Sequence, residues 1–235
     1  MQSPWYTLRP YPEFPLFHLL SEAAARHPSR PALLTPDGEH WTFRQVDDAA
    51  RRVAALLAPS VRKGDRVLFM APNSPAYAAA VYGAMMAGAA VVPLNPLFKP
   101  NELRRVLTDT EPAAAFVSRE VAPLVDSLRP GAPSLRVVRI LETLWQDLES
   151  IGAAAPVGLD PRADIAALPF SSGTTGFPKG VMLTHFNLVA NLRQTLATGM
   201  TPPYATLLNY MPFFHVYGFA SVMGMAFAMA IPQVI

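Results

Sequence analysis

The sequence predicts an α/β fold in which helices cover both faces of a parallel sheet. Short apolar runs typical of buried strands alternate with longer helical patterns, and the links between them are short. Apolar residues make up 51% of the 235 residues and charged residues only 15%, whereas soluble domains carry about 25% charged residues. A chain of this composition buries more of its surface than most, as a sheet with two covered faces does.

The N-terminal part begins with simple local patterns. We expect an extended proline-rich segment over 1–15, a short helix over 17–26 and a hairpin that turns at 36–38. Thr42 and Gln45, three positions apart, form a capping box that starts the next helix. The apolar residues of that helix fall on one face, which is the pattern of a partly buried helix.

Strands and helices then alternate through the middle of the chain. Ser74 caps one helix, with Pro75 at its first position, and Asn101 caps the next. This alternation favours parallel strands joined by helical crossovers. The expected strands are 66–70, 89–95, 113–118 and 135–141, and the expected helices are 75–87, 101–108 and 119–128.

An exposed connection over 149–164 separates two predicted subdomains. We expect a first α/β subdomain over 1–160, which includes the N-terminal hairpin, and the start of a second α/β subdomain over 161–235. The second subdomain is expected to contain a strand over 166–172, a loop, a strand over 181–184 and a helix over 184–197.

The composition argues against several classes of protein. With no cysteine, the chain has no disulfide, thiolate catalyst or cysteine metal site. A net charge of +2 without a basic stripe argues against nucleic-acid binding. The charge-free stretches 76–94 and 194–235 are interrupted by glycine and proline, so we expect no membrane span. The N-terminus lacks the pattern of a secretory signal, and we expect a cytoplasmic protein.

The stretch SSGTTGFPKG, residues 171–180, allows three interpretations. It could be a turn in which glycines supply positive φ, a loop that binds phosphate, or a Walker A loop. Walker A spacing is excluded, because Gly173 and Gly176 are three apart and Gly180 follows Lys179 where a hydroxyl is required. The turn and the phosphate loop both remain.

Two details favour the phosphate loop over the plain turn. Four hydroxyl side chains, those of Ser171, Ser172, Thr174 and Thr175, are more than a turn requires. Lys179 is one of only three lysines among 19 basic residues. A lysine provides a compact charge that suits a phosphate approached through a crowded loop, whereas arginine suits flat bidentate sites.

The wider segment PFSSGTTGFPKGVMLTH closely resembles the signature of the acyl-adenylate-forming, or AMP-binding, enzymes. These include acyl- and aryl-CoA ligases, luciferases and the adenylation domains of peptide synthetases. Other segments resemble the family's motifs in the same order, so the resemblance extends over essentially the whole chain. They are WTFRQV (41–46), KGDRVLFMAPNSPAY (63–77), MMAGAAVVPLNPLFKPNEL (85–103) and MPFFHVYGF (211–219).

The resemblance implies the layered parallel-sheet N-terminal domain of an adenylating enzyme, with the second sheet only begun. It implies that a carboxylate attacks the α-phosphorus of ATP, that pyrophosphate leaves, and that CoA then displaces AMP to give a thioester. Lys179 is implied as a catalytic cation, and Mg²⁺ is implied without an assignable ligand. The residues implied to hold ATP are Ser171, Ser172, Gly173, Thr174, Thr175, Gly176, Phe177, Pro178 and Lys179.

His215 has two interpretations. From its surroundings alone it is a structural histidine among aromatic side chains, with a carbonyl as partner. The resemblance instead implies a catalytic and substrate-binding residue near the substrate carboxylate, and it favours a plain carboxylic acid over an amino acid. It also implies that Tyr217, Gly218 and Phe219 line the acyl pocket. His185, at the start of a helix that Thr184 caps, is interpreted as structural.

Members of the family are usually much longer, and their later motifs, Tyr-Gly-x-Thr-Glu and Thr-Gly-Asp, are not found here. We therefore expect the N-terminal portion of a longer enzyme, without the C-terminal domain, inactive alone and prone to self-association, with a homodimer as one form. The expected whole enzyme is a medium- or long-chain fatty acid–CoA ligase, with an aryl-acid–CoA ligase as the alternative. A hypothesis of a different class is a stand-alone, non-catalytic module for nucleotide binding or assembly.

Overall fold

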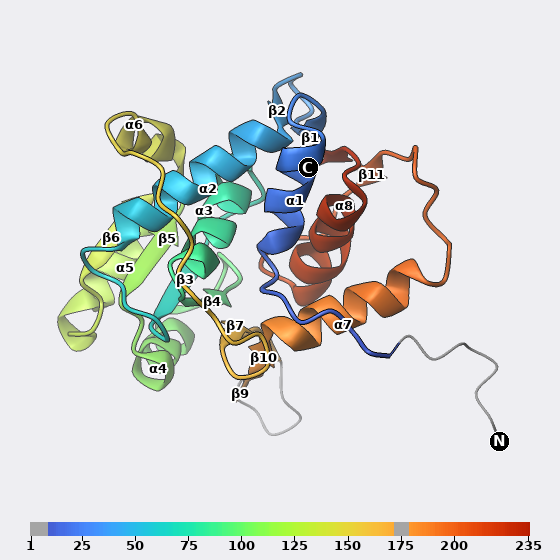
Figure 1. Cartoon of the computed structure of the whole chain (residues 1–235). Coiled ribbons are helices and arrows are strands. Elements are labelled where there is room, and N and C mark those ends of the chain that lie inside the picture. The colour runs from blue at the N-terminus through green and yellow to red at the C-terminus, as the bar shows by residue number, and fades with distance from the viewer. Residues whose placement is uncertain (1–8, 172–178) are drawn as a thin grey trace.

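The computed structural model describes residues 9–171 and 179–235 (Figure 1). In this part of the chain the strands form sheets of six, four and two strands. The six-stranded sheet has the order β10-β7-β4-β3-β5-β6 and confirms the predicted α/β class. Its strands are Leu183–Thr184, Ile165–Ala167, Ala90–Pro93, Arg66–Met70, Ala114–Val117 and Val137–Ile140 in that order.

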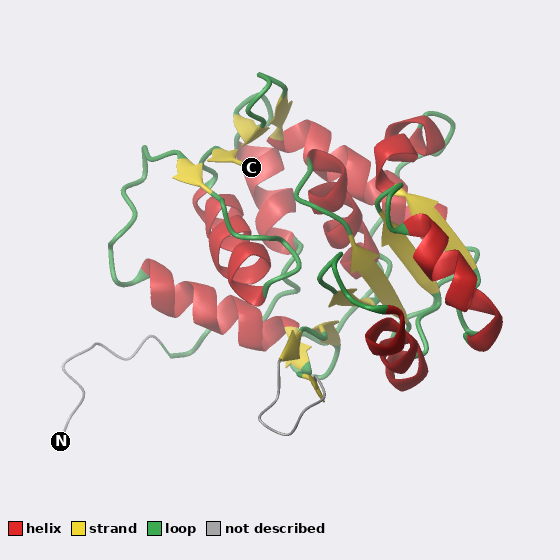
Figure 2. Ribbon diagram, turned by 180° about the vertical axis from the view of Figure 1, so that it is seen from behind, coloured by secondary structure: helices red, strands yellow, loops and turns green. Residues whose placement is uncertain are grey.

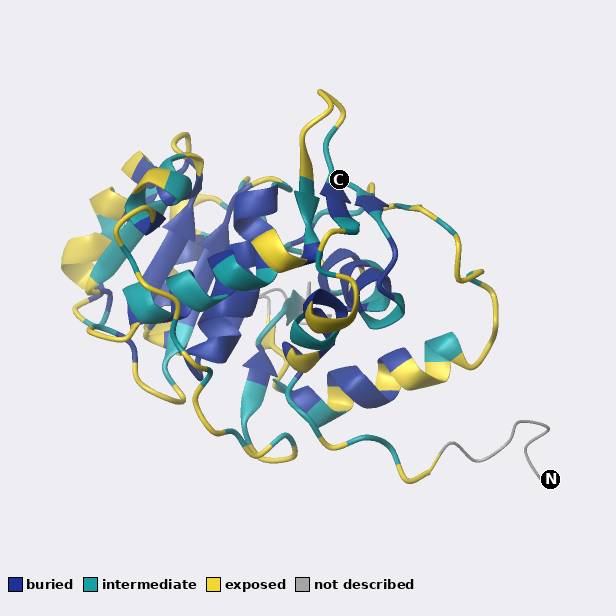
Figure 3. Cartoon of the chain, turned by 45° about the horizontal axis from the view of Figure 1, so that its top comes forward, coloured by how far each residue is buried: buried dark blue, intermediate teal, exposed yellow. Residues whose placement is uncertain are grey.

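This sheet is parallel from β7 to β6, and only the edge strand β10 runs antiparallel. Because side chains alternate along a strand, β3 sends Val67 and Phe69 to one face and Leu68 and Met70 to the other. Two separate cores result, and the central strands β3, β4 and β5 between them are almost wholly buried, whereas the edge strands β6 and β10 are half-buried (Figure 3). The predicted sheet with two covered faces is therefore confirmed.

Each core has its own helices. The first core contains α2 (Phe43–Leu57) and α3 (Pro75–Met86), and the second contains α4 (Pro100–Thr110) and α5 (Ala122–Leu128). Figure 1 shows α2 and α3 on the near side of the sheet, and the view from behind in Figure 2 shows the opposite side. Gly83 allows α2 and α3 to pack closely, because a Cβ there would lie 2.5 Å from the Ala50 carbonyl oxygen.

The four-stranded sheet joins distant parts of the chain. Its order is β11-β12-β1-β2, and β1 pairs in parallel with β12, with Leu33 opposite Gln233. β1 and β2 form the predicted antiparallel hairpin. The strands are Leu207–Leu208, Gln233–Val234, Pro31–Leu34 and His40–Thr42 in sheet order.

Helices α1, α7 and α8 lie below this sheet in Figure 1. A π-helical segment, Tyr217–Met223, leads directly into α8. The remaining short elements are α6 and two 3₁₀ turns that flank β6. The bounds are α1 His18–Arg26, α6 Leu144–Leu148, α7 His185–Leu196, α8 Gly224–Met229, and the turns Arg129–Gly131 and Leu141–Thr143.

Capping chemistry sets several helix starts. The N–H of Gln45 donates to Thr42 Oγ1 and that of Tyr77 to Ser74 Oγ, as predicted. The prediction for Asn101 was wrong: α4 begins at Pro100, after Lys99 at the N-cap. Proline is preorganised for the first helical position, which moves the start back by one residue. Asn101 instead accepts a hydrogen bond from Arg104.

The predicted strand over 166–172 was also wrong, because it divides between two sheets. β7 ends at Ala167, and after Pro169 the pair Phe170–Ser171 forms β8, which joins Lys179–Gly180 (β9) in a two-stranded ribbon. Proline has no N–H to continue the ladder with β4.

The six-stranded sheet contains strands from both sides of residue 160, since β7 pairs with β4. The division into subdomains at that residue stays a prediction. Among the described residues, no helix combines the length and the apolar character needed to cross a bilayer.

Candidate functional site

The two-stranded ribbon holds both ends of the predicted phosphate loop. Ser171 pairs with Lys179, and Phe170 pairs with Gly180. Gly180 lies under the Phe170 ring, where an added Cβ would be 3.3 Å from the ring. Lys179 is exposed at the start of β9. Ser172, Gly173, Thr174, Thr175, Gly176, Phe177 and Pro178, also predicted to bind ATP, lie outside the described residues.

A cavity of about 490 Å³ lies beside this ribbon. Its walls include the residues that follow β4 and β7, at the carboxyl ends of neighbouring parallel strands. This is the edge at which open α/β sheets bind ligands. The described lining residues are Pro93, Leu94, Asn95, Phe98, Glu102, Pro169, Phe170, Val181, Leu183, Phe214, His215 and Val216.

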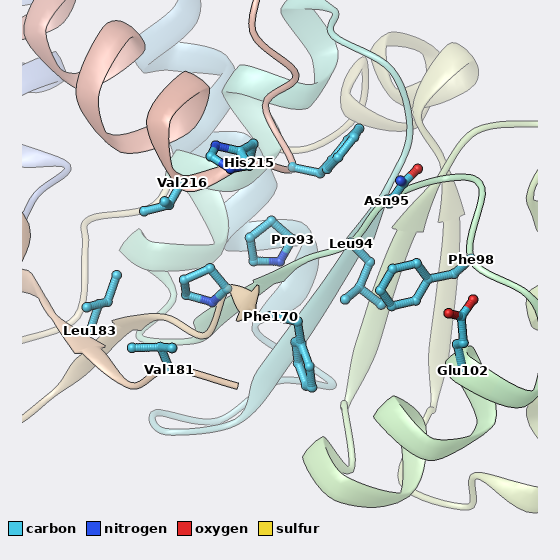
Figure 4. A pocket seen from close by; sticks show the side chains of 12 residues that line it. Pro93, Leu94, Asn95, Phe98, Glu102, Phe170, Val181, Leu183, His215 and Val216 are labelled. Carbon is cyan, nitrogen blue, oxygen red and sulfur yellow. The ribbon is translucent and has the colours of Figure 1, made fainter. Parts of the chain in front are cut away.

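The cavity wall is largely apolar, and its polar side chains are those of Asn95, Glu102 and His215. The first two are engaged locally. Asn95 Oδ1 accepts the N–H of Leu97 at 2.9 Å, and Glu102 Oε2 accepts the N–H of Lys99 at 2.7 Å. In Figure 4, His215 lies on one side of the cavity and Phe170 on the other.

The hydrogen bond at His215 determines which ring nitrogen carries the proton. Nδ1 accepts the backbone N–H of Tyr217 at 3.2 Å. An accepting imidazole nitrogen is unprotonated, so the neutral ring carries its proton on Nε2. His215 can therefore donate a hydrogen bond from Nε2 to an anionic oxygen.

The other residues predicted to line the acyl pocket lie elsewhere. Tyr217 is 52% exposed, and Phe219 is only 1% exposed within the first core. Gly218 closes a tight turn, because a Cβ there would lie 2.4 Å from the Pro212 carbonyl oxygen. None of the three lines the cavity beside β8 and β9. Their role in an acyl pocket stays a prediction.

His185 has a structural environment. It is 1% exposed, and its Nδ1 accepts the N–H of Leu16 at 3.0 Å. Burial lowers the pKa of His185 to about 4, against a smaller opposite effect of the Asp164 carboxylate. The neutral ring thus fastens the segment before α1 to the start of α7. This agrees with the structural interpretation.

Sequence reasoning did not identify most of the cavity wall. Pro93, Leu94 and Asn95 end the predicted strand over 89–95, and the rule that ligands bind at carboxyl ends of parallel strands points to them. Phe170 and Val181 flank the predicted phosphate loop. Their apolar character gave no sign that they meet the end of β4.

The described residues provide no evident protein site for a metal ion. Within 9–171 and 179–235, no three His, Asp or Glu side chains are grouped so that they could hold one. We therefore assign no ligand to Mg²⁺.

Comparison with known proteins gives consistent relatives. A long-chain-fatty-acid–CoA ligase of Bacillus subtilis is 31% identical, with 91% of this chain and 44% of that protein aligned. The 4-coumarate–CoA ligase 3 of Oryza sativa subsp. japonica is 36% identical, with 83% of this chain and 37% of that protein aligned. The chain thus spans less than half the length of these curated relatives.

Comparison with solved structures and with family models points to the same kind of protein. The crystal structure of a long-chain-fatty-acid-CoA ligase from Archaeoglobus fulgidus superposes with a TM-score of 0.88 at 27% identity, covering 95% of this chain and 47% of that one. The family model described as AMP-binding enzyme matches residues 20–231, which include the ribbon, the cavity wall and both layers of helices. Because the sheet, the sequence of the loop and the extent of the match all point to the same family, the chain belongs to the AMP-binding enzyme family.

Proposed function

We propose that this chain supplies the ATP- and acid-holding part of an ATP-dependent carboxylic acid–CoA ligase. The observation that carries the proposal is the position of the cavity. His215, whose Nδ1 accepts the N–H of Tyr217, borders an apolar space that lies next to the strand pair leading into the predicted phosphate loop. The names of the relatives, which are fatty-acid and 4-coumarate ligases, support the same chemistry.

In the first proposed step, a substrate carboxylate oxygen attacks the α-phosphorus of ATP. A P–O bond forms to the acyl group, and the bond to pyrophosphate breaks. A carboxylate with a pKa of about 4 is already an anionic nucleophile at neutral pH, so no general base is needed. Catalysis then depends on position and charge, as in other phosphoryl chemistry.

The chain's own residues have separate roles in this step. Lys179 stabilises the charge on the departing phosphates in this proposal, and the loop signature over 171–178, most of which lies outside the described residues, binds ATP. His215 donates from Nε2 to the substrate carboxylate and orients it. Mg²⁺, which is general in this kind of chemistry, is left with ATP, and no described residue is assigned to it.

In the second proposed step, the thiol sulfur of CoA attacks the acyl carbon of the adenylate. A C–S bond forms, the bond from the acyl carbon to the AMP oxygen breaks, and AMP leaves. The thiol proton goes to solvent.

The apolar wall favours an acid with an apolar chain. Pro93, Leu94 and Val181 offer no hydrogen bond from their side chains, and the volume falls in the usual range for small-molecule sites of about 300–1,000 Å³. We propose a medium- or long-chain fatty acid. The rings of Phe98, Phe170 and Phe214 also suit an aryl acid, which the 4-coumarate relatives favour as a second candidate.

Exchange of radiolabelled pyrophosphate into ATP by the whole enzyme, of which this chain is expected to be the N-terminal portion, tests the proposal directly. Octanoate, palmitate, 4-coumarate and phenylalanine are compared as the driving acid. We expect exchange with the first three classes of carboxylic acid and none with phenylalanine. Exchange driven only by phenylalanine would contradict the ligase assignment. ATP binding with no exchange by any acid would favour the non-catalytic module.

Two variants with a matched control assign the roles. Lys179→Ala is expected to lower exchange by on the order of 100-fold, as removal of a transition-state donor does. His215→Ala is expected to raise the KM for the acid more than the KM for ATP. Lys63→Ala is the control for loss of a lysine, because Lys63 pairs with Asp164 at 2.8 Å rather than with the ribbon. If all three variants behave alike, the assignment of Lys179 is wrong.

A further inference from the structure

A polar side chain after β3 connects that strand to the segment that carries His215. Asn73 lies in the short loop between β3 and α3, next to Ser74. Ser74 accepts the N–H of Tyr77 and caps α3. The amide of Asn73 is therefore not used in the cap and is available to a distant partner.

Both ends of the Asn73 amide bind the segment 211–213. Oδ1 accepts the N–H of Phe213 at 2.6 Å, and Nδ2 donates to the Met211 carbonyl oxygen at 3.0 Å. An N–H requires an acceptor and a carbonyl requires a donor, so these partners fix the orientation of the amide. One side chain thus binds two backbone groups of a segment that is distant in sequence.

Further contacts fix the backbone that follows the two hydrogen bonds of Asn73. The Phe213 ring is fully buried and lies 5.6 Å from the Tyr77 ring. The N–H of His215 donates to the Pro212 carbonyl oxygen at 2.9 Å. Gly218 packs against the same carbonyl with no space for a Cβ. The turn over 211–218 is therefore built onto the end of β3 through Asn73 and Phe213.

The same turn brings the Tyr217 N–H to Nδ1 of His215 at 3.2 Å. A shift of the backbone would break this contact and allow the ring to place its proton on either nitrogen. The side chain of Asn73 does not line the cavity. Any effect of Asn73 on a ligand there is transmitted through His215.

We propose that Asn73 is a positioning residue for His215. By holding the backbone over 211–213, it keeps the imidazole in one tautomer, with Nε2–H available to the cavity. The role of this tautomer, which is to donate a hydrogen bond from Nε2 to the carboxylate of an acid substrate, rests on the proposed function. The tautomer itself does not, and it can be measured without turnover.

Long-range ¹H–¹⁵N correlation spectra of the imidazole rings test this in the 235-residue chain at about pH 8, where imidazole is neutral. A His215→Ala spectrum identifies the signals of His215. The wild type is expected to show one tautomer with the proton on Nε2. Asn73→Ala and the nearly isosteric Asn73→Asp are expected to show averaged ¹⁵N shifts from two tautomers, with faster hydrogen exchange of the Tyr217 amide.

The control is Gln45→Ala, which removes the capping hydrogen bond that Thr42 donates to Gln45 at the start of α2. Gln45→Ala lowers the stability of the fold but removes no contact of the turn over 211–218, so His215 is expected to keep one tautomer. Asn73→Asp retains the side-chain volume and provides the result if Asn73→Ala does not fold. Unchanged His215 signals in a folded Asn73 variant would overturn the proposal, and so would two tautomers in the wild type. If the wild type shows one Nε2–H tautomer and the Asn73 variants show two, but the whole wild-type enzyme gives no acid-dependent exchange, the result would count against the proposed function alone.

Discussion

Two stretches of this chain lack charged side chains, and the fold buries one completely and the other only in part. From 76 to 94, every residue is buried within α3, β4 and their link. In the stretch from 194 to 235, Met200, Tyr204, Leu208 and Tyr210 are exposed by 66% to 84%. A charge-free sequence therefore predicts burial only where the neighbouring elements cover both sides.

The difference arises from the sheets to which the two stretches belong. β4 has hydrogen-bonded neighbours on both sides, and its alternate side chains, Val91 and Val92, enter different cores. β11 is an edge strand with β12 on one side only. The N–H groups of Leu207 and Asn209 bond to the β12 side, so that of Leu208 points outward.

Methionine offers a matched test of this comparison. Met86 is fully buried and Met200 is 77% exposed. We expect Met86→Ala to lower the free energy of unfolding by about 3–4 kcal/mol, because it removes buried methylenes and leaves a cavity. Met200→Ala should change it by less than about 0.5 kcal/mol. Urea denaturation measures both, and equal losses would break the comparison.

His185 tests the cost of burying a polar group where the N-terminal segment meets α7. Its folded pKa of about 4 lies below the ordinary value of 6.5, so the unfolded chain takes up the proton first as pH falls. Stability from this group is complete above about pH 6.5 and is lost toward pH 4.

We expect the loss between pH 7.5 and 4.5 to be about 2.5 kcal/mol larger in the wild type than in His185→Asn. Asparagine can still accept the N–H of Leu16 but does not titrate. Denaturation at several pH values measures this difference. Parallel pH profiles for the two proteins would show that folding does not lower the pKa of His185.

The smallest expected effect on stability comes from Leu208. Leu208→Lys should change the free energy of unfolding by less than about 0.5 kcal/mol, yet reduce self-association by placing a charge at the exposed edge. Sedimentation velocity measures the association. Leu97→Lys is the control, since Leu97 is 85% exposed but lies in the loop after β4. Equal effects of both variants would mean that the edge of β11 is not the associating surface.

Local chemistry explains why much of the fold could be predicted. Thr42, Ser74 and Thr184 cap helices as expected, because a cap depends on residues three positions away. The strands of the six-stranded sheet other than β7 were anticipated from apolar runs, and β10 lies within the predicted strand over 181–184. The prediction failed at Asn101 because proline set the helix start. It failed at Pro169, which was itself a signal against one continuous strand.

The candidate site was less predictable, because its wall depends on pairing between distant strands. Lys179 and His215 were named from motifs. Pro93 and Phe170 meet because β4 pairs with β7, and no local pattern specifies that pair. The role of Asn73 could not be predicted from its neighbours in sequence, because its hydrogen-bond partners lie far away at Met211 and Phe213.

The pairing of β1 with β12 has a consequence for how the chain acquires its structure. Leu33 meets Gln233, so the two partners are separated by 200 positions. Closing a loop of that length costs entropy before the contact provides any gain, which slows folding. During synthesis from the N-terminus, the β1–β2 hairpin is made long before β12 and presents an unpaired edge in the meantime. The four-stranded sheet is therefore completed only after β12 has been made, and until then its open edge is available to wrong partners.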